Sequence, residues 1–321
     1  MAARTHASLS VIVPHYGDPQ DVQKLVESLL EENSPSLRRI VVVDDSSPIT
    51  FPKNWAPEHP SHTEFKVIYR ETNGGFGSAV NTGLDNVDTE LALVLNSDLV
   101  LPEHFIEDLQ DAAAPWHPAV MSPEVTGLDG HTQWTARHFP TISHQVVEWL
   151  SPLARFREKP LLHEAVGHDT RAVAGNVVPV DWVFGAAMLL PVKEVKKIGG
   201  FDENFFMNAE EVDLQKRLRE NGVPSIYLGT VQVTHVGGGS SDPERRRRWL
   251  VEARHRYAQK WGNPKALKAA LTAASYVNYG VNAVRQKAGR DIDAKDVLNT
   301  ELSYLKDEQT GNKAVKSADV N

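Results

Sequence analysis

The stretch LALVLNSD, Leu91 to Asp98, decides the fold. Five apolar residues run without a break and stop at a polar end, a pattern typical of a short strand buried on both faces of a sheet. The polar end would then lie at the carboxyl edge of the sheet, where open α/β folds bind ligands. A carboxylate at that edge, that of Asp98, is suited to hold a divalent cation on a diphosphate.

The segments before this stretch alternate between strand and helix patterns. Strands are predicted at Ser10–Pro14, Arg39–Val43 and Phe65–Tyr69, with a helix at Asp21–Glu32 and a glycine-rich turn entering a helix at Asn73–Asn81. This order predicts an α/β fold with a mostly parallel central sheet flanked by helices. Right-handed crossovers would place all the polar strand ends on one rim.

The rest of the chain predicts further parts. A strand pattern returns at Asp181–Leu190, an acidic helix begins near Asn208, and two short strands at Ser225–Leu228 and Val231–Val233 lead to His235. From Pro243 the composition changes to basic helices. We therefore expect one α/β domain at 1–242, in two parts at 9–115 and 116–242. A helical extension at 243–290 and a charged, flexible tail at 291–321 would follow.

Composition excludes several classes of protein. The 321 residues carry a net charge of -8, which argues against a dedicated nucleic-acid binder. The chain has no cysteine, so disulfides and thiolate chemistry are excluded and cytoplasmic residence is favoured. No stretch reaches the roughly 18 apolar residues of a spanning helix. We expect a cytoplasmic protein, with a peripheral position on the inner face of the plasma membrane as the alternative.

Polar clusters fall at the predicted ends of strands and helices. They are Asp44/Asp45, Asn73–Gly77, Asn96–Asp98, Glu210–Asp213 and His235. Taken singly, each has a structural interpretation: a turn, a left-handed turn before a helix, an N-cap, first-turn acids that are favoured by the helix dipole, and a structural histidine. Their order along the chain is more specific than any one of them.

In this order the clusters resemble the inverting glycosyltransferases of family 2, which have a GT-A fold, over residues 9–262. The resemblance rests on Ser10–Pro14, Val43–Ser47, Asn73–Gly77 with Asn81, Asn96–Asp98, Trp182–Gly185, Gly199–Glu203 with Glu210–Asp213, and His235. Within the family the chain is most similar to the rhamnosyltransferase-like branch that acts on polyprenyl-diphosphate-linked sugars. The resemblance implies inverting transfer of a sugar from a nucleotide-diphosphate sugar, with dTDP or UDP favoured. The acceptor would be a hydroxyl of a glycan or lipid-linked molecule in cell-wall or surface polysaccharide synthesis.

The resemblance implies that residues 1–242 are a catalytic domain, in which the half at 9–115 binds the nucleotide sugar and the half at 116–242 binds the acceptor. It also implies a donor site. Pro14 and Tyr16 would flank the base, and Asp44 would accept a hydrogen bond from it, because a carboxylate is an acceptor only. The glycine-rich loop would bring main-chain N–H groups close to the nucleotide. The expected donor-binding residues in full are Pro14, Tyr16, Asp44, Ser46, Asn73, Gly74, Gly75, Gly77, Asn81 and Asn96.

The implied metal is Mg²⁺ or Mn²⁺, which would neutralise charge on the departing nucleotide. Asp98 matches the last acid of the family's DXD motif, and His235 would complete the metal shell. The first acid of that motif is Asn96 here, so the site has one charge fewer.

The catalytic base needs a carboxylate within reach of the acceptor hydroxyl. The family pattern is Glu-Asp-x-Asp, and this chain has Glu210-Glu211-Val212-Asp213. Glu211 takes the position of the base, and Asp213 is the reserve candidate. Trp182, Phe184 and Gly185 would form a platform for the acceptor sugar, unless they are plain core residues.

Other interpretations stay open. Asn96 and Glu211 favour a non-catalytic nucleotide-sugar-binding protein that keeps the fold. A nucleotidyltransferase would need a basic glycine-rich loop after the first strand, where this chain has His15–Asp18. The run Arg245–Arg248 and the helix Pro264–Lys287 are either solvated or packed on the domain, or they contact a lipid diphosphate or a membrane within residues 245–287. The sequence also leaves a homo-oligomer open.

Overall fold

The computed structural model describes residues 6–59, 62–156, 159–237 and 242–306. The chain divides into two compact units. The first contains residues 1–138, 171–206 and 210–240, and the second contains residues 139–170, 207–209 and 241–321. The sequence predicted a boundary at 242/243, but it did not indicate that residues 139–170 belong with the C-terminal helices.

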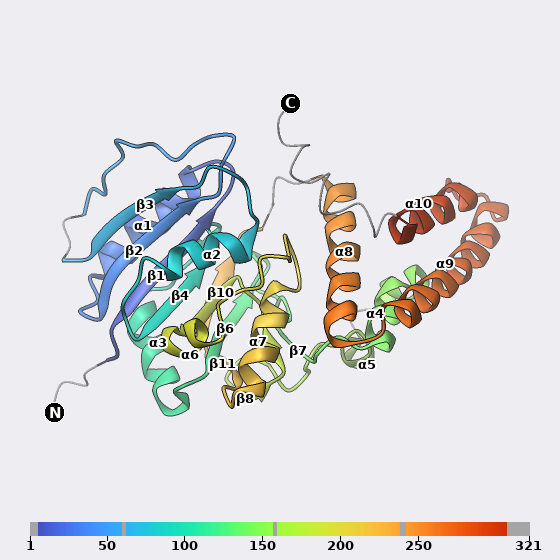
Figure 1. Cartoon of the computed structure of the whole chain (residues 1–321). Coiled ribbons are helices and arrows are strands. Elements are labelled where there is room, and N and C mark those ends of the chain that lie inside the picture. Colours follow the sequence, from blue (N-terminus) through green and yellow to red (C-terminus); the bar gives the residue numbers. More distant parts are fainter. Residues whose placement is uncertain (1–5, 60–61, 157–158, 238–241, 307–321) are drawn as a thin grey trace. The chain divides into compact units, whose positions relative to one another are not determined.

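The first unit is built on a mixed sheet (Figure 1). Among the described residues, the strands run in the order β3-β2-β1-β4-β10-β6-β11-β5, with β8 paired to β11. Their bounds are β1 Leu9–His15, β2 Leu37–Asp44, β3 Glu64–Tyr69, β4 Leu91–Leu95, β5 Leu99–Val100, β6 Val120–Thr126, β8 Val177–Val180, β10 Ala187–Pro191 and β11 Ser225–His235. The strands β7, Ala136–Arg137, and β9, Trp182–Val183, form a separate antiparallel pair.

Helices cover both faces of this sheet and create two hydrophobic cores. The helices are α1 Gln20–Glu32, α2 Phe76–Leu84, α3 Phe105–Ala113, α6 Val192–Lys197 and α7 Glu210–Glu220, and a 3₁₀ turn, η1, spans Ala114–Trp116. Successive residues of β4 alternate between the cores: Leu93 belongs to the core that contains α1 and α3, and Val94 to the core that contains α2 and α7. All five residues of β4 are buried, as the unbroken apolar run predicted.

The parallel half of the sheet is confirmed, and the other half differs from the prediction. β1 pairs in parallel with β2 and β4, but β10 is antiparallel to both β4 and β6. The predicted strand Asp181–Leu190 is divided into β9 and β10 by Phe184–Ala186. The two short strands predicted before His235 are one strand, β11, whose register against β6 shifts between Leu228 and Gln232.

The second unit is helical. It contains α4 Ile142–Trp149, the 3₁₀ turn η2 Ser151–Phe156, α5 Pro160–Ala165, α8 Pro243–Trp261, α9 Pro264–Lys287 and α10 Ala294–Lys306. Trp149 is buried and donates from its indole N–H to the Ser275 hydroxyl at 2.9 Å, while Asn278 donates to the Trp149 carbonyl at 3.1 Å. These bonds tie α4 to α9, although the two helices are more than 100 residues apart in sequence.

The predicted flexible tail is wrong over the residues of α10. Residues 294–306 form a regular helix that packs on α9, because Leu305 contributes to the same hydrophobic core as Trp149 and Leu271. The part of the predicted tail at 307–321 lies outside the described residues. In the part of the chain that the structure describes, no helix is long and apolar enough to cross a membrane.

Candidate functional site

Asp98 and His235 face each other at the edge of the first unit's sheet. Asp98 follows β4, and the next two residues form β5, which pairs antiparallel with the end of β11, with Leu99 opposite His235. This pairing brings the His235 Nε2 to 3.1 Å from the Asp98 Oδ2. Burial alone would raise the pKa of the Asp98 carboxyl, but the hydrogen bond and charge of His235 and nearby main-chain N–H groups hold that pKa below its ordinary value.

This pair fits a divalent cation. Neighbouring ligands of an octahedral ion at about 2.1 Å lie about 3 Å from each other, close to the separation of the two donor atoms. A carboxylate oxygen with an imidazole nitrogen is a donor set that suits Mn²⁺ better than Mg²⁺, which prefers oxygen alone. Asn96 lies two residues before Asp98, and its main-chain N–H donates to the Ala186 carbonyl at 2.8 Å, so this segment is held against the β9–β10 connection.

The glycine-rich loop before α2 is organised by Asp45. Its carboxylate accepts from the main-chain N–H groups of Gly74 at 3.1 Å and Gly75 at 2.8 Å, and it pairs with the Arg70 Nε at 2.7 Å. Burial raises the pKa of the Asp45 carboxyl, although these partners oppose the change. We expected the N–H groups of this loop to approach the nucleotide; those of Gly74 and Gly75 point to Asp45 instead. Asn73 also accepts from the Gly75 N–H, at 3.1 Å.

The same loop brings the predicted parts of the site together. Gly75 has φ +83°, and a Cβ there would lie 1.8 Å from the carbonyl oxygen of Phe206, so only glycine fits this close approach. A Cβ on Gly77 would lie 3.4 Å from the Glu210 Cβ, and one on Gly185 would lie 2.9 Å from the Phe76 ring. The loop therefore touches both the acidic start of α7 and the acceptor platform predicted at Trp182–Gly185.

Glu211 has the environment expected of a proton acceptor. Its Oε2 is buried, and within the described residues it has no hydrogen-bond partner. Burial raises the pKa of the Glu211 carboxyl to about 7, with smaller opposing effects from a main-chain hydrogen bond and from the charge of Arg137. A carboxyl that titrates near neutral pH can accept a proton and release it again.

Asp213 is placed differently. Its side chain is fully buried and pairs with the Arg217 Nε at 2.8 Å. Arg217 in turn donates to the carbonyls of Ile198 at 3.1 Å and Gly200 at 2.7 Å. Asp213 therefore anchors the turn that follows α6. Glu210 is also buried, and it lies beside the glycine-rich loop.

Trp182 and Phe184 form an aromatic pair under Arg137. Their ring centroids are 5.1 Å apart, and the Arg137 guanidinium lies 4.6 Å from the Phe184 ring and 5.9 Å from the Trp182 ring. Gln215 fixes β9 to α7, because its amide exchanges hydrogen bonds of 2.8 and 2.7 Å with the N–H and carbonyl of Val183. Val183, which lies between the two aromatic residues, is thus held by a residue one helical turn after Glu211.

The residues predicted to bind the nucleotide base differ in how exposed they are. Tyr16 is 47% exposed and Pro14 is half-buried, so a ring at Tyr16 is accessible for stacking. Asp44 is buried, and its two carboxylate oxygens accept from the N–H groups of Ser47 and Phe51 at 2.8 and 2.7 Å. Its role in base binding stays a prediction.

Two further predicted donor-site residues, Ser46 and Asn81, have features that shape or hold the backbone. Ser46 has a left-handed φ of 60°. Asn81 accepts from the Phe201 N–H at 2.8 Å and donates to the Phe201 carbonyl at 3.0 Å, which ties α2 to the turn after α6.

Several residues around these sites carried no sequence signal. Arg70, Gln133, Arg137 and Gln215 acquire their partners only through the fold.

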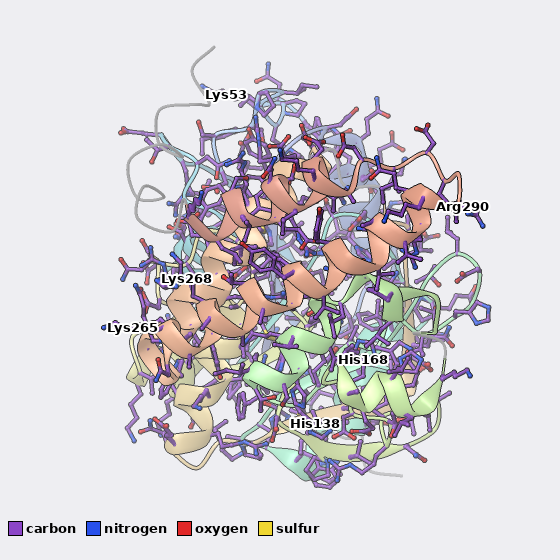
Figure 2. All side chains as sticks on the ribbon, turned by 90° about the vertical axis from the view of Figure 1, so that its right-hand side faces the viewer. Lys53, His138, His168, Lys265, Lys268 and Arg290 are labelled. Carbon is purple, nitrogen blue, oxygen red and sulfur yellow. The ribbon has the colours of Figure 1, made fainter. Side chains whose placement is uncertain are left out.

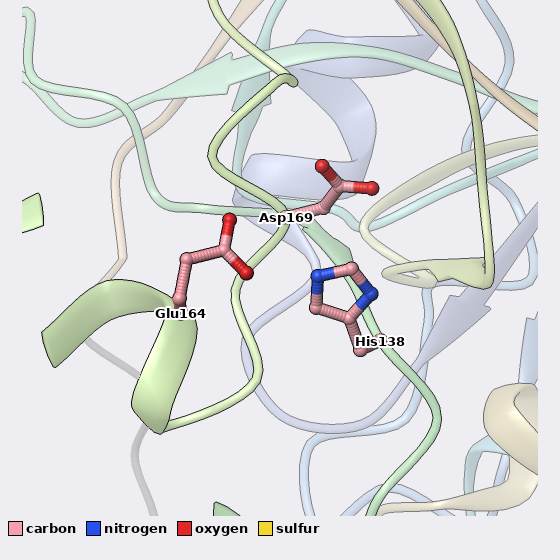
Figure 3. Close-up of side chains that lie close together, drawn as sticks. All are labelled: His138, Glu164 and Asp169. Atoms are coloured by element: carbon pink, nitrogen blue, oxygen red, sulfur yellow. The ribbon is translucent and has the colours of Figure 1, made fainter. Parts of the chain in front are cut away.

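The second unit also brings together acids that the sequence did not indicate. Figure 3 shows Glu164, in the last turn of α5, and Asp169, which is buried; the His138 drawn with them belongs to the first unit. Glu164 accepts from the Thr170 N–H at 2.9 Å, which closes the loop after α5.

The chain is similar to known glycosyltransferases. Residues 10–182 match the model of the family described as glycosyl transferase family 2. A hexosyltransferase of low-salt glycan biosynthesis from Haloferax volcanii is 27% identical over 229 residues; the match covers 70% of this chain and 65% of the relative. An N-acetylglucosaminyl-diphospho-decaprenol L-rhamnosyltransferase from Mycobacterium tuberculosis is 24% identical over 251 residues, which are 71% of this chain and 75% of the relative.

A solved structure shares the fold. It is a mannosyltransferase from Pyrobaculum calidifontis, in complex with GDP-Man and Mn²⁺. Its TM-score is 0.56 at 15% identity, with 93% of this chain and 80% of that chain covered. The predicted GT-A fold is thereby confirmed.

Proposed function

The chain belongs to glycosyl transferase family 2 and is a glycosyltransferase, and from this premise we propose that it is a metal-dependent inverting enzyme. We propose a nucleotide-diphosphate sugar as donor, with UDP or dTDP as the nucleotide and rhamnose among the candidate sugars. The acceptor would be a hydroxyl of a glycan or polyprenyl-diphosphate-linked molecule in cell-wall or surface polysaccharide synthesis. The observation that supports the proposal most is the glycine-rich loop, which touches both the start of α7 and the platform segment.

On the donor side, Asp98 and His235 would hold Mn²⁺ or Mg²⁺ against the diphosphate. The ion, when bound, neutralises charge that develops on the departing nucleoside diphosphate. Asn96, two residues before Asp98, would offer a neutral oxygen without adding charge. Tyr16 is exposed and can cover the base, as the resemblance implies.

On the acceptor side, Glu211 would take the proton from the attacking hydroxyl. The hydroxyl oxygen forms the new bond to the anomeric carbon, and the bond from that carbon to the diphosphate oxygen breaks on the opposite face. Inversion follows from this single displacement. Trp182 and Phe184 would support the apolar face of the acceptor sugar. The positive charge of Arg137, which lies over their rings, lowers the pKa of the Glu211 carboxyl and so partly opposes the effect of burial.

Nucleoside diphosphates should stabilise the folded chain if it binds such donors. We expect UDP or dTDP at about 100 times its dissociation constant to add about 2.7 kcal/mol to the free energy of unfolding, hence a shift in Tm of several degrees, and Mn²⁺ to enlarge it. A thermal-shift panel of UDP, dTDP and GDP sugars, each with and without Mn²⁺, measures this. The matching nucleosides serve as controls. No shift with any nucleoside diphosphate would contradict the proposed donor class.

We also propose that α9 contacts an anionic membrane surface. The helix contains Lys265, Lys268, Arg285 and Lys287 and no acidic residue. Figure 2 shows Lys265 and Lys268 at its N-terminal end. Tyr276, Val277 and Val284 are each more than half exposed on the same helix. An exposed apolar face with cations at both ends suits the interface of an anionic bilayer. In the run Arg245–Arg248, Arg247 and Arg248 already lie over the rings of Trp149 and Tyr304.

The double variant Tyr276→Ser/Val277→Ser should weaken membrane binding roughly tenfold or more, because two apolar side chains no longer enter the interface. Cosedimentation of the full chain with vesicles of phosphatidylcholine and phosphatidylglycerol measures the effect. Leu128→Ser, which changes an exposed apolar side chain of the first unit, is the matched control. Equal cosedimentation of all three proteins would exclude the membrane contact. Loss of a dimer in the double variant would instead identify α9 as a contact between copies.

A further inference from the structure

His235 has a second partner on the side of the ring that faces away from Asp98. The Gln133 Oε1 lies 2.8 Å from the His235 Nδ1, and the Gln133 Nε2 lies 3.5 Å from the main-chain carbonyl oxygen of His235. One amide side chain therefore contacts both the ring and the backbone of the same residue, which lies 102 positions away in sequence.

These two contacts determine where the ring carries its hydrogen. A main-chain carbonyl only accepts, so the Gln133 NH₂ must be the group that faces it. The amide oxygen then faces Nδ1, and Nδ1 must donate. A neutral His235 in this arrangement keeps the lone pair on Nε2, directed at the Asp98 side. With its hydrogen on Nδ1, the ring offers Nε2 as the nitrogen that can bind a cation.

The backbone around Gln133 is fixed independently of His235. Its N–H donates to the Val125 carbonyl at 2.9 Å, and the hairpin between them is closed by a 2.9 Å bond from the Gly127 N–H to the His131 carbonyl. Trp134, which comes next, has a φ of 52°, a left-handed conformation that is costly for a bulky residue and persists where the surrounding structure over-determines the backbone. Gln133 thus lies in a constrained segment that folds back on the end of β6.

We propose that Gln133 is a positioning residue that fixes the ring orientation and tautomer of His235 so that Nε2 faces the cation held by Asp98. This inference rests on the proposed metal site and extends it to a residue that touches neither the donor nor the ion. Outer partners of ligating histidines set the tautomer and orientation in metal sites, and their loss commonly weakens metal binding roughly 10–100-fold. The same size of effect is expected here.

Gln133→Met keeps the length of the side chain and removes both hydrogen bonds. We expect roughly tenfold weaker Mn²⁺ binding in the presence of UDP, with unchanged affinity for UDP without metal. Gln133→Glu keeps an acceptor for Nδ1 and should recover most of the Mn²⁺ affinity. Calorimetric titration of the full chain measures these affinities. Nitrogen modulation in the electron spin echo of bound Mn²⁺ reports whether an imidazole is still a direct ligand, and it should fall in Gln133→Met.

The outcomes separate this inference from the function it rests on. If the wild-type chain binds UDP without any Mn²⁺ effect, the proposed metal site is wrong, and the role of Gln133 fails with it. If the wild-type chain shows Mn²⁺-dependent binding with nitrogen modulation and Gln133→Met matches it within twofold, only the role of Gln133 is overturned. If Gln133→Met does not fold, Gln133→Leu, which also lacks an acceptor for Nδ1, takes its place: nitrogen modulation lower than in Gln133→Glu supports the role, and equal modulation in the two variants overturns it.

Discussion

Replacing Glu211 with glutamine is expected to lower turnover by roughly 10²–10⁴-fold while leaving donor affinity nearly unchanged. The substitution keeps the size of the side chain and removes its ability to ionise and to accept a proton. The Oε2 of Glu211 is buried without a partner among the described residues, so no hydrogen bond of the wild type is lost there. Initial rates with saturating donor, together with calorimetric titration of the nucleoside diphosphate, separate the two effects.

The pH dependence should identify the same carboxyl. Because burial raises the pKa of Glu211 to about 7, the wild-type rate should rise with pH up to about that value, as the base becomes ionised. Stability should change in the opposite direction. The folded chain holds a proton that the unfolded chain loses near pH 4.5, so this contribution to stability is present below pH 4.5 and is lost as pH rises through 7.

Glu211→Gln mimics the protonated carboxyl at every pH. Relative to wild type, its free energy of unfolding should therefore increase by roughly 3 kcal/mol between pH 4 and pH 8, from 1.36 kcal/mol for each unit of pKa shift. Urea unfolding at a series of pH values measures this difference. Glu220→Gln, at the exposed end of the same helix, removes the same charge and should show neither effect. Retention of most activity in Glu211→Gln would place the base elsewhere.

The sequence predicted the elements whose signal is local. β4 was evident from five apolar residues because both faces of a central strand are buried, and α9 was predicted with the bounds that it has, Pro264–Lys287. β11 was predicted as two strands because Gly229 interrupts an apolar pattern. In the structure the strand continues through Gly229, and its register against β6 shifts there. The place of α4 with the C-terminal helices could not be predicted, since it depends on the bond between Trp149 and Ser275 across the sequence.

The candidate site divides in the same way. Polar residues at strand and helix ends marked Asp98, His235 and Glu211, because parallel topology brings such ends to one rim. The side chains that contact His235 or lower the pKa of Glu211 do not follow strands or begin helices, so no such pattern marks them. Gln133 lies 102 residues before His235, and Arg137 lies 74 residues before Glu211. A glutamine or arginine in a segment without a regular pattern is usually a solvated surface residue, so neither one is evident from the sequence. Asp44 and Asp45 are adjacent in sequence, yet one holds the turn after β2 and the other holds the glycine-rich loop.

Asp98→Ala is expected to abolish the effect of Mn²⁺ on donor binding. Asp98 is the acid of the proposed metal pair, and its loss leaves only His235 of that pair. We expect the affinity for UDP in the presence of Mn²⁺ to fall by on the order of 100-fold or more, beyond the range that outer-shell residues commonly cost. Activity should fall with it, because the departing diphosphate would no longer be neutralised.

Binding without metal distinguishes a ligand role from a structural one. A carboxylate near the diphosphate repels it when no cation lies between them, so Asp98→Ala should leave the metal-free affinity for UDP unchanged or higher. If Asp98 only supported the fold through its ion pair with His235, the variant would lower both affinities together. Asp108→Ala, which removes an exposed acid from α3, controls for the change in net charge. Titrations of UDP with and without Mn²⁺ on the three proteins distinguish the two roles. Titrations of Mn²⁺ with and without UDP check the result, because Mn²⁺ and UDP must change each other's affinity by the same factor.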